Sequence, residues 1–119
     1  MFNFEKLEVW QKSVEFADTI YKNTKNYPKE ELFGITSQLR RASVSISLNI
    51  AEGAGRKSIK EFKHFIGMAY GSLAETITLL KISLKRKYLP NEIVDELYTS
   101  CEEIGKMLSG LTKTLNSKL

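Results

Sequence analysis

Cysteine, histidine and proline are scarce in this chain of 119 residues. It has one cysteine, Cys101, one histidine, His64, and two prolines, at positions 28 and 90. A single cysteine excludes an internal disulfide and is typical of a reducing compartment, so we expect a cytoplasmic protein. The chain also lacks the Cys/His cluster of a zinc site, and we expect neither a metal nor a cofactor. With few prolines to interrupt them, the regular elements are expected to be few and long.

Long hydrophobic runs are also absent. No segment approaches the roughly 18 apolar residues that a membrane span needs, and the first ten residues include acids, unlike a secretory signal. The composition, 42% hydrophobic and 27% charged, is ordinary for a soluble protein. The sequence therefore predicts one soluble domain over residues 1–119, without membrane contact.

What the chain does have is helical periodicity. Apolar residues recur at steps of three and four, and no segment alternates with the period of two that marks a strand. A capping-box pattern at Ser58–Glu61 begins one helix, and Gly53 and Gly55 are expected to end another. Helices are predicted at about residues 4–25, 29–54, 58–87 and 91–117. Short links between four helices favour an all-α fold, an antiparallel up-down four-helix bundle.

The spacing also predicts which side chains face the core. In the first helix the expected seam is Leu7, Trp10, Val14, Ala17, Tyr21 and Thr24. In the second helix it is Leu32, Ile35, Leu39, Ala42, Ile46, Asn49 and Gly53. In the fourth helix the seam includes Cys101.

The second helix carries a further apolar stripe, which a four-helix bundle does not need. Phe33, Val44, Leu48 and Ala51 lie roughly opposite the seam. Scattered surface apolar residues are common, but the regular spacing favours a subunit interface. In the third helix, Gly67 and Gly71 stand one turn apart, which suggests close packing against a partner.

No catalytic constellation emerges from the sequence. Cys101 is expected to be buried and inert, His64 has no partner for metal binding or catalysis, and no Glu-x-x-His pair of a di-iron bundle is present. We therefore do not expect an enzyme.

Positive charge is unevenly distributed. The formal net charge is +4, and residues 58–88 alone carry six basic and two acidic side chains, also a net +4. Lys60, Lys63, Lys81 and Lys85 share one side of the third helix with its paired glycines. Two interpretations stay open at this point: a stripe that binds phosphates, or a solvated face.

Three segments together resemble the four-helix-bundle proteins encoded within intervening sequences of 23S ribosomal RNA genes. The segments are FEKLEVWQKSVEFADTIY, YPKEELFGITSQLRRASVSISLNIAEGAGR and FKHFIGMAYGSLAET, and the resemblance extends over nearly the whole chain. It implies a bacterial cytoplasmic protein, an antiparallel bundle, a ring-shaped homopentamer and no enzymatic activity. The chain is also similar to the accessory protein of diversity-generating retroelements, which binds nucleic acid and associates with a reverse transcriptase.

The leading hypothesis is thus a homo-oligomer that binds nucleic acid, above all structured RNA, by its shape, because most aromatics are expected in the core. The expected phosphate contacts are Arg40, Arg41, Arg56, Lys57, Lys60, Lys63, Lys81, Lys85, Arg86 and Lys87. The expected oligomer interface is Phe33, Val44, Leu48, Ala51, Gly67 and Gly71. Two alternatives remain: a scaffold for a nucleic-acid enzyme such as a reverse transcriptase, and a bundle without a ligand.

Overall fold

A computed structural model describes residues 1–118, which form four α-helices and two short 3₁₀ helices and contain no strand. Leu119, the last residue of the expected domain, lies outside the described residues. The α-helices are α1 (Glu8–Asn23), α2 (Ile35–Ala54), α3 (Ile59–Lys85) and α4 (Asn91–Asn116), and the 3₁₀ helices are Asn3–Lys6 and Lys29–Glu31. The all-α prediction is confirmed.

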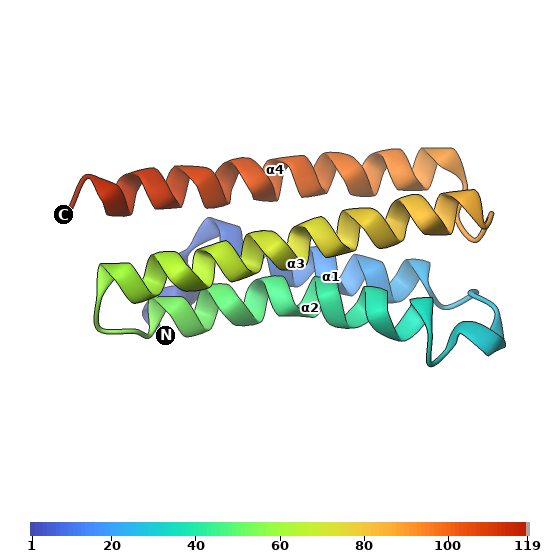
Figure 1. Cartoon of the computed structure of the whole chain (residues 1–119), viewed down its shortest axis with the longest axis horizontal. Helices are drawn as coiled ribbons and strands as arrows, with labels where there is room; N and C mark the ends of the chain where they lie inside the picture. Colours follow the sequence, from blue (N-terminus) through green and yellow to red (C-terminus); the bar gives the residue numbers. More distant parts are fainter. Residues whose placement is uncertain (119) are drawn as a thin grey trace.

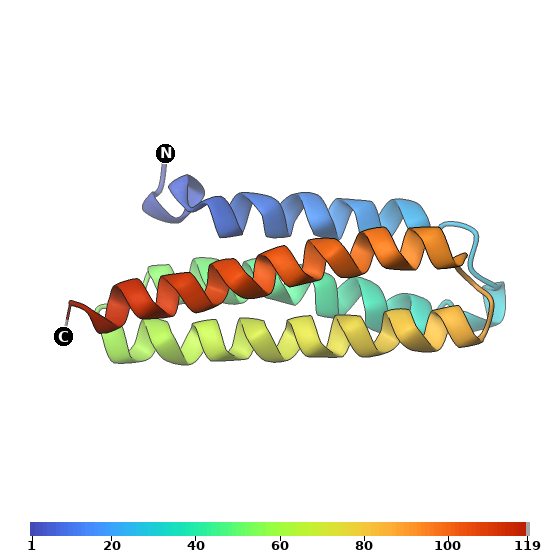
Figure 2. The same cartoon turned by 90° about the horizontal axis from the view of Figure 1, so that it is seen from above.

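The helices pack as an elongated bundle of 47 × 23 × 22 Å. Consecutive helices run in opposite directions along its length (Figure 1). α1 contacts α2 and α4, and α3 contacts the same two helices. The four helices therefore occupy the corners of a square, with the α1–α2 flank opposite the α3–α4 flank (Figure 2).

The helix boundaries follow local signals, with one substantial departure. The Ser58 hydroxyl accepts a hydrogen bond from the Glu61 backbone N–H at 3.1 Å, as the capping pattern predicts. Gly55 is the residue after α2, which also agrees with the sequence. The predicted start of the second helix near residue 29 is wrong, because Gly34 has φ −115° and ψ −118°, outside the helical region, and α2 begins only at Ile35.

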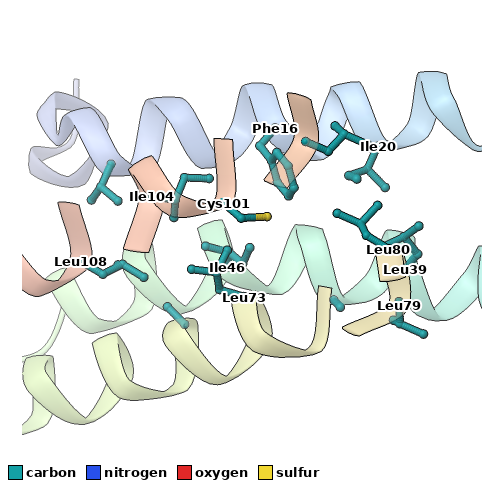
Figure 3. Packing of buried hydrophobic residues seen from close by; sticks show 14 of the residues in the cluster. Phe16, Ile20, Leu39, Ile46, Leu73, Leu79, Leu80, Cys101, Ile104 and Leu108 are labelled. Carbon is teal, nitrogen blue, oxygen red and sulfur yellow. The ribbon is translucent and has the colours of Figure 1, made fainter. Parts of the chain in front are cut away.

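The core contains side chains from all four helices. Phe16 and Ile20 of α1 face Ile46 of α2, Leu80 of α3 and Ile104 of α4 across the centre of the bundle (Figure 3). Fully burying an aliphatic or phenylalanine side chain contributes roughly 1.5–3 kcal/mol, so this cluster is the main source of stability. It also holds the outward faces of the helices in fixed positions.

The expected core seam of the first helix is partly wrong. Val14 and Tyr21 are 41% and 44% exposed, whereas Val9, Phe16 and Ile20 are buried. Steps of three and four residues fit both the predicted seam and the observed one. The observed seam is favoured because burying Phe16 and Ile20 removes more apolar surface from water. In the second helix, Leu32 is likewise exposed, because it precedes α2.

α2 and α3 form the closest helix pair. Gly53 lies against α3 so tightly that a Cβ there would come within 2.7 Å of the Phe65 Cβ. Farther along, the Ser72 hydroxyl donates a hydrogen bond to Ser45 Oγ at 3.1 Å. Small side chains allow this close approach of α2 and α3.

Candidate nucleic-acid interface

A groove of about 510 Å³ runs between α3 and α4. We call it the α3–α4 groove. Its floor is apolar, with Tyr70, Leu73 and Ile77 from α3, and its α4 wall includes Gly105 and several small residues. The full lining is Tyr70, Leu73, Ala74, Ile77, Tyr98, Cys101, Glu102, Gly105, Lys106, Ser109, Gly110 and Lys113.

Small residues, Gly105, Ser109 and Gly110, form part of the α4 wall of the groove. A Cβ at the buried Gly105 would come within 3.5 Å of Leu73, an ordinary contact distance, so α4 packs against α3 at this point without being crowded. A second hollow of about 240 Å³ shares Tyr70 and Ser109 with the groove and extends it along α3 to Lys63. Together they make a continuous depression along this flank.

Four lysines surround this depression. Lys106 and Lys113 of α4 line the groove, Lys63 of α3 lines its extension, and the Lys81 ammonium lies 4.6 Å from the Tyr98 ring centroid. The depression has one acidic lining residue, Glu102. The lining residues carry three positive charges and one negative charge, a net +2, with Lys81 beside them, and no ion pair within residues 1–118 neutralises any of the four lysines. The lining of the depression is therefore net positive.

The predicted phosphate contacts do not form one cluster. Lys63 and Lys81 lie at the depression, as expected for a stripe on α3. Arg56 and Lys57 lie in the turn before α3, whereas Arg86 and Lys87 follow its other end, roughly 40 Å away for a helix of 27 residues. Lys60 is exposed in the first turn of α3, and Lys85 is its last residue. The α3 set is thus distributed along the length of the bundle.

Two of the predicted arginines are already engaged within the chain. Arg56 pairs with Glu52 at 3.7 Å, and its guanidinium carbon lies 4.7 Å from the Phe65 ring centroid. Arg40 donates from Nε to Thr24 Oγ1 at 2.9 Å. Arg40 and Arg41 also belong to α2 and border a hollow with Tyr21 of α1, so they lie on the flank opposite the α3–α4 groove.

Lys106 and Lys113 were not predicted from the sequence. They are seven residues apart on one face of α4, two turns from each other, and this spacing is the signal that would have found them. The acidic balance of the fourth quarter, three basic and five acidic residues over 89–119, conceals them when charge is summed by segment.

The expected interface residues lie on the surface. Leu48 is 62% exposed, and Val44 and Ala51 are half-buried on α2. Phe33 is not part of the helical stripe, because it lies in the turn before α2. A Cβ at Gly67 or Gly71 would meet nothing within 4 Å, so the close packing expected there is not made within this chain.

Residues 5–110 match the 23S rRNA-intervening sequence protein family. The chain belongs to this family. A crystal structure of a protein of unknown function, from the S23 ribosomal protein family of Bacteroides thetaiotaomicron, is similar to it: 29% identity over 88% of this chain and 98% of that chain, with a TM-score of 0.79. A comparison with curated proteins finds no match. The resemblance inferred from the sequence is confirmed.

In this member of the 23S rRNA-intervening sequence family, the single cysteine and the single histidine are the side chains best suited to act as a nucleophile or a metal ligand. Cys101 is buried on α4, and burial raises the pKa of its thiol to about 12, so the reactive thiolate is disfavoured. His64 is exposed, and residues 1–118 contain no group of three His, Cys, Asp or Glu side chains able to hold a metal ion. No helix in the described part of the chain is long and apolar enough to span a membrane.

Proposed function

We propose that this protein is a non-enzymatic, cytoplasmic homo-oligomer, a ring of five copies, that binds structured RNA through the α3–α4 groove. The observation that carries the proposal is the set of four lysines around a depression with one acidic lining residue. Lysines in this arrangement bind a polyanion without reading its sequence. The family's description links its members to 23S rRNA intervening sequences, so RNA is the polymer to test first.

Assembly would strengthen a modest site. Five copies of a chain with net charge +4 carry about +20, and a polyanion that contacts several copies at once gains avidity. The exposed Leu48 on α2 supports assembly, since it is a large apolar side chain that the bundle leaves uncovered. Recognition would depend on the shape of the RNA rather than on base edges.

The test is a pair of quadruple alanine variants. The first replaces Lys63, Lys81, Lys106 and Lys113. The matched control replaces Lys6, Lys22, Lys25 and Lys29, four exposed lysines in α1 and the segments flanking it. Both remove the same charge, so any difference in RNA affinity reports the position of the lysines rather than their number.

We expect the first variant to bind a structured RNA more weakly than the control between 50 and 200 mM salt. Its slope of log affinity against log salt should be shallower by roughly 3 if all four lysines contact phosphates. Fluorescence anisotropy measures both quantities, and circular dichroism and light scattering verify that fold and mass are unchanged. Equal affinities for the two variants would exclude the α3–α4 groove as the site.

A second candidate function is a scaffold for a nucleic-acid enzyme such as a reverse transcriptase. The observation in its favour is the apolar floor of the groove, Tyr70, Leu73 and Ile77, which an RNA backbone does not need. A protein partner held there would remain bound at high salt, whereas a polyanion would dissociate.

A further inference from the structure

A second hollow of about 430 Å³ lies on the α1–α2 flank. It is lined by Tyr21, Leu32, Phe33, Ser37, Arg40, Arg41 and Val44, and we call it the Phe33 hollow. Its size is within the roughly 300–1,000 Å³ of small-ligand sites. It combines aromatic rings with two guanidinium groups. Because most aromatic side chains were expected in the core, the sequence did not predict this combination.

Phe33 is presented to solvent by a fixed turn. Its side chain is 94% exposed, because α2 begins only after Gly34. The Glu31 carboxylate holds the turn: it accepts hydrogen bonds from the Tyr88 hydroxyl at 2.8 Å and from the Ile35 N–H at 3.3 Å. The anchored turn fixes the backbone at Phe33, so a ligand that covers the residue has only its side chain left to order.

Arg40 extends the aromatic surface beside Phe33. Its guanidinium carbon lies 4.7 Å from the Tyr21 ring centroid, which is a stacking distance, and its Nε is held by Thr24 Oγ1. The guanidinium therefore lies over the Tyr21 ring, and the hydrogen bond to Thr24 restrains its orientation. A planar group held in this way is itself a stacking surface for a nucleobase.

The hollow also has unneutralised positive charge. No carboxylate belongs to its lining, and neither Arg40 nor Arg41 takes part in an ion pair within residues 1–118. An apolar protein surface placed here would leave two guanidiniums desolvated without a partner, which is unfavourable. The hollow is therefore complementary to an occupant that supplies both an aromatic face and an anion.

We propose that the Phe33 hollow binds an unpaired nucleotide of RNA. The base stacks on Phe33 and on the Arg40–Tyr21 pair, and the adjoining phosphate is bound by Arg41. Bases within a duplex are stacked on each other, so only loops, bulges and ends offer this combination. The inference rests on the proposed RNA-binding function, but it concerns the flank opposite the α3–α4 groove and adds a preference for unpaired bases.

The experiment uses a short single-stranded RNA with a central 2-aminopurine, whose fluorescence is quenched when the base stacks on an aromatic ring. The variants are Phe33→Ala, Phe33→Trp, and Phe2→Ala as a matched control, since Phe2 is also an exposed phenylalanine but lies outside the hollow. Anisotropy against the same RNA and against a blunt RNA duplex measures affinity, and light scattering measures mass.

We expect Phe33→Ala to abolish the quenching and to weaken binding of the single strand about 5- to 150-fold, with duplex binding unchanged. Phe33→Trp should keep both signals, and Phe2→Ala should behave as the unaltered protein does. Unchanged quenching in Phe33→Ala would overturn the proposal. So would a loss of oligomer mass with intact RNA affinity, which would make the hollow a contact between protein chains.

Two further arms separate related explanations. If a nucleoside monophosphate competes as well as the RNA at equal nucleotide concentration, the site takes free nucleotides and the RNA proposal is overturned. The quadruple α3–α4 groove variant separates the two sites: if it loses duplex binding but retains quenching, the Phe33 hollow is confirmed as an independent site. If quenching is lost only in Phe33→Ala and all variants bind the duplex equally, the α3–α4 groove is excluded as an RNA site. The proposal that the Phe33 hollow binds an unpaired nucleotide is then still supported.

Discussion

Glu31 illustrates how one side chain connects distant parts of this fold. It lies at the end of the 3₁₀ helix before α2, and its partner Tyr88 follows α3, 57 residues later in the chain. The hydrogen bond from Tyr88, with a second from the Ile35 N–H, lowers the pKa of the Glu31 carboxyl below its ordinary 4.5. A carboxylate with a lowered pKa stabilises the folded state only while it is ionised.

The sign of the pH dependence follows from this lowered pKa. The stabilisation from Glu31 is fully present above pH 4.5 and is lost as the pH falls through the lowered folded pKa. We therefore expect Glu31→Gln to be less stable than the unaltered protein at neutral pH, with the difference shrinking in acid. Urea unfolding over this pH range measures it. A difference that is no larger than that of Glu30→Gln, the exposed neighbour, would contradict the role of the hydrogen bonds.

The helices show which features the sequence encodes locally. The Ser58 cap, the stop at Gly55 and the breaks at the two prolines all act within a few residues, so the end of α2 and the limits of α3 and α4 were predicted closely. The start of α2 was not predicted, since Lys29–Glu31 and Ile35–Ala54 are each helical and only the backbone at Gly34 separates them.

Gly53 offers a direct test of the closest helix pair. Gly53→Ala would place a Cβ 2.7 Å from the Phe65 Cβ, so α2 and α3 would have to separate. We expect a loss of about 1–3 kcal/mol in the free energy of unfolding, as for other overpacked cores. Gly110→Ala is the control: nothing lies within 4 Å of its Cβ, and it should gain roughly 0.5–1 kcal/mol from helix propensity. Denaturant unfolding measures both changes in the free energy of unfolding. If Gly53→Ala were as stable as Gly110→Ala, α2 and α3 would accommodate the added Cβ without cost, and the close packing at Gly53 would not matter.

The whole molecule presents two unlike flanks, which suit an assembly with more than one surface in use. The α3–α4 flank carries the depression with its net positive lining, whereas the α1–α2 flank carries the Phe33 hollow and the exposed Leu48. We expect neighbouring copies to cover Leu48 of α2, which leaves the α3–α4 groove free for RNA. Because the Phe33 hollow includes Val44 of the same apolar stripe, that contact must end short of the hollow for both surfaces to be used.

Leu48 is the residue at which to test assembly. Because it is 62% exposed in the single chain, Leu48→Lys should fold normally and yield monomers, the new charge being tolerated by water but not by an apolar contact. Size-exclusion chromatography with light scattering measures the mass. Val14→Lys, at an exposed apolar residue of α1, should leave the mass unchanged. If Leu48→Lys assembles as well as Val14→Lys, the stripe is not the interface.

By itself, the sequence determined the helical class, the number of helices, most core seams and the family, because these depend on periodicity and capping over short spans of chain. Tertiary structure alone decided which series of α1 is buried, since the spacing fits two series and only packing against Ile46 and Ile104 selects the one with Phe16 and Ile20. It also decided the candidate sites. Lys63 and Lys106 line adjoining hollows, and Tyr21 contacts Arg40, only because antiparallel helices bring distant segments together.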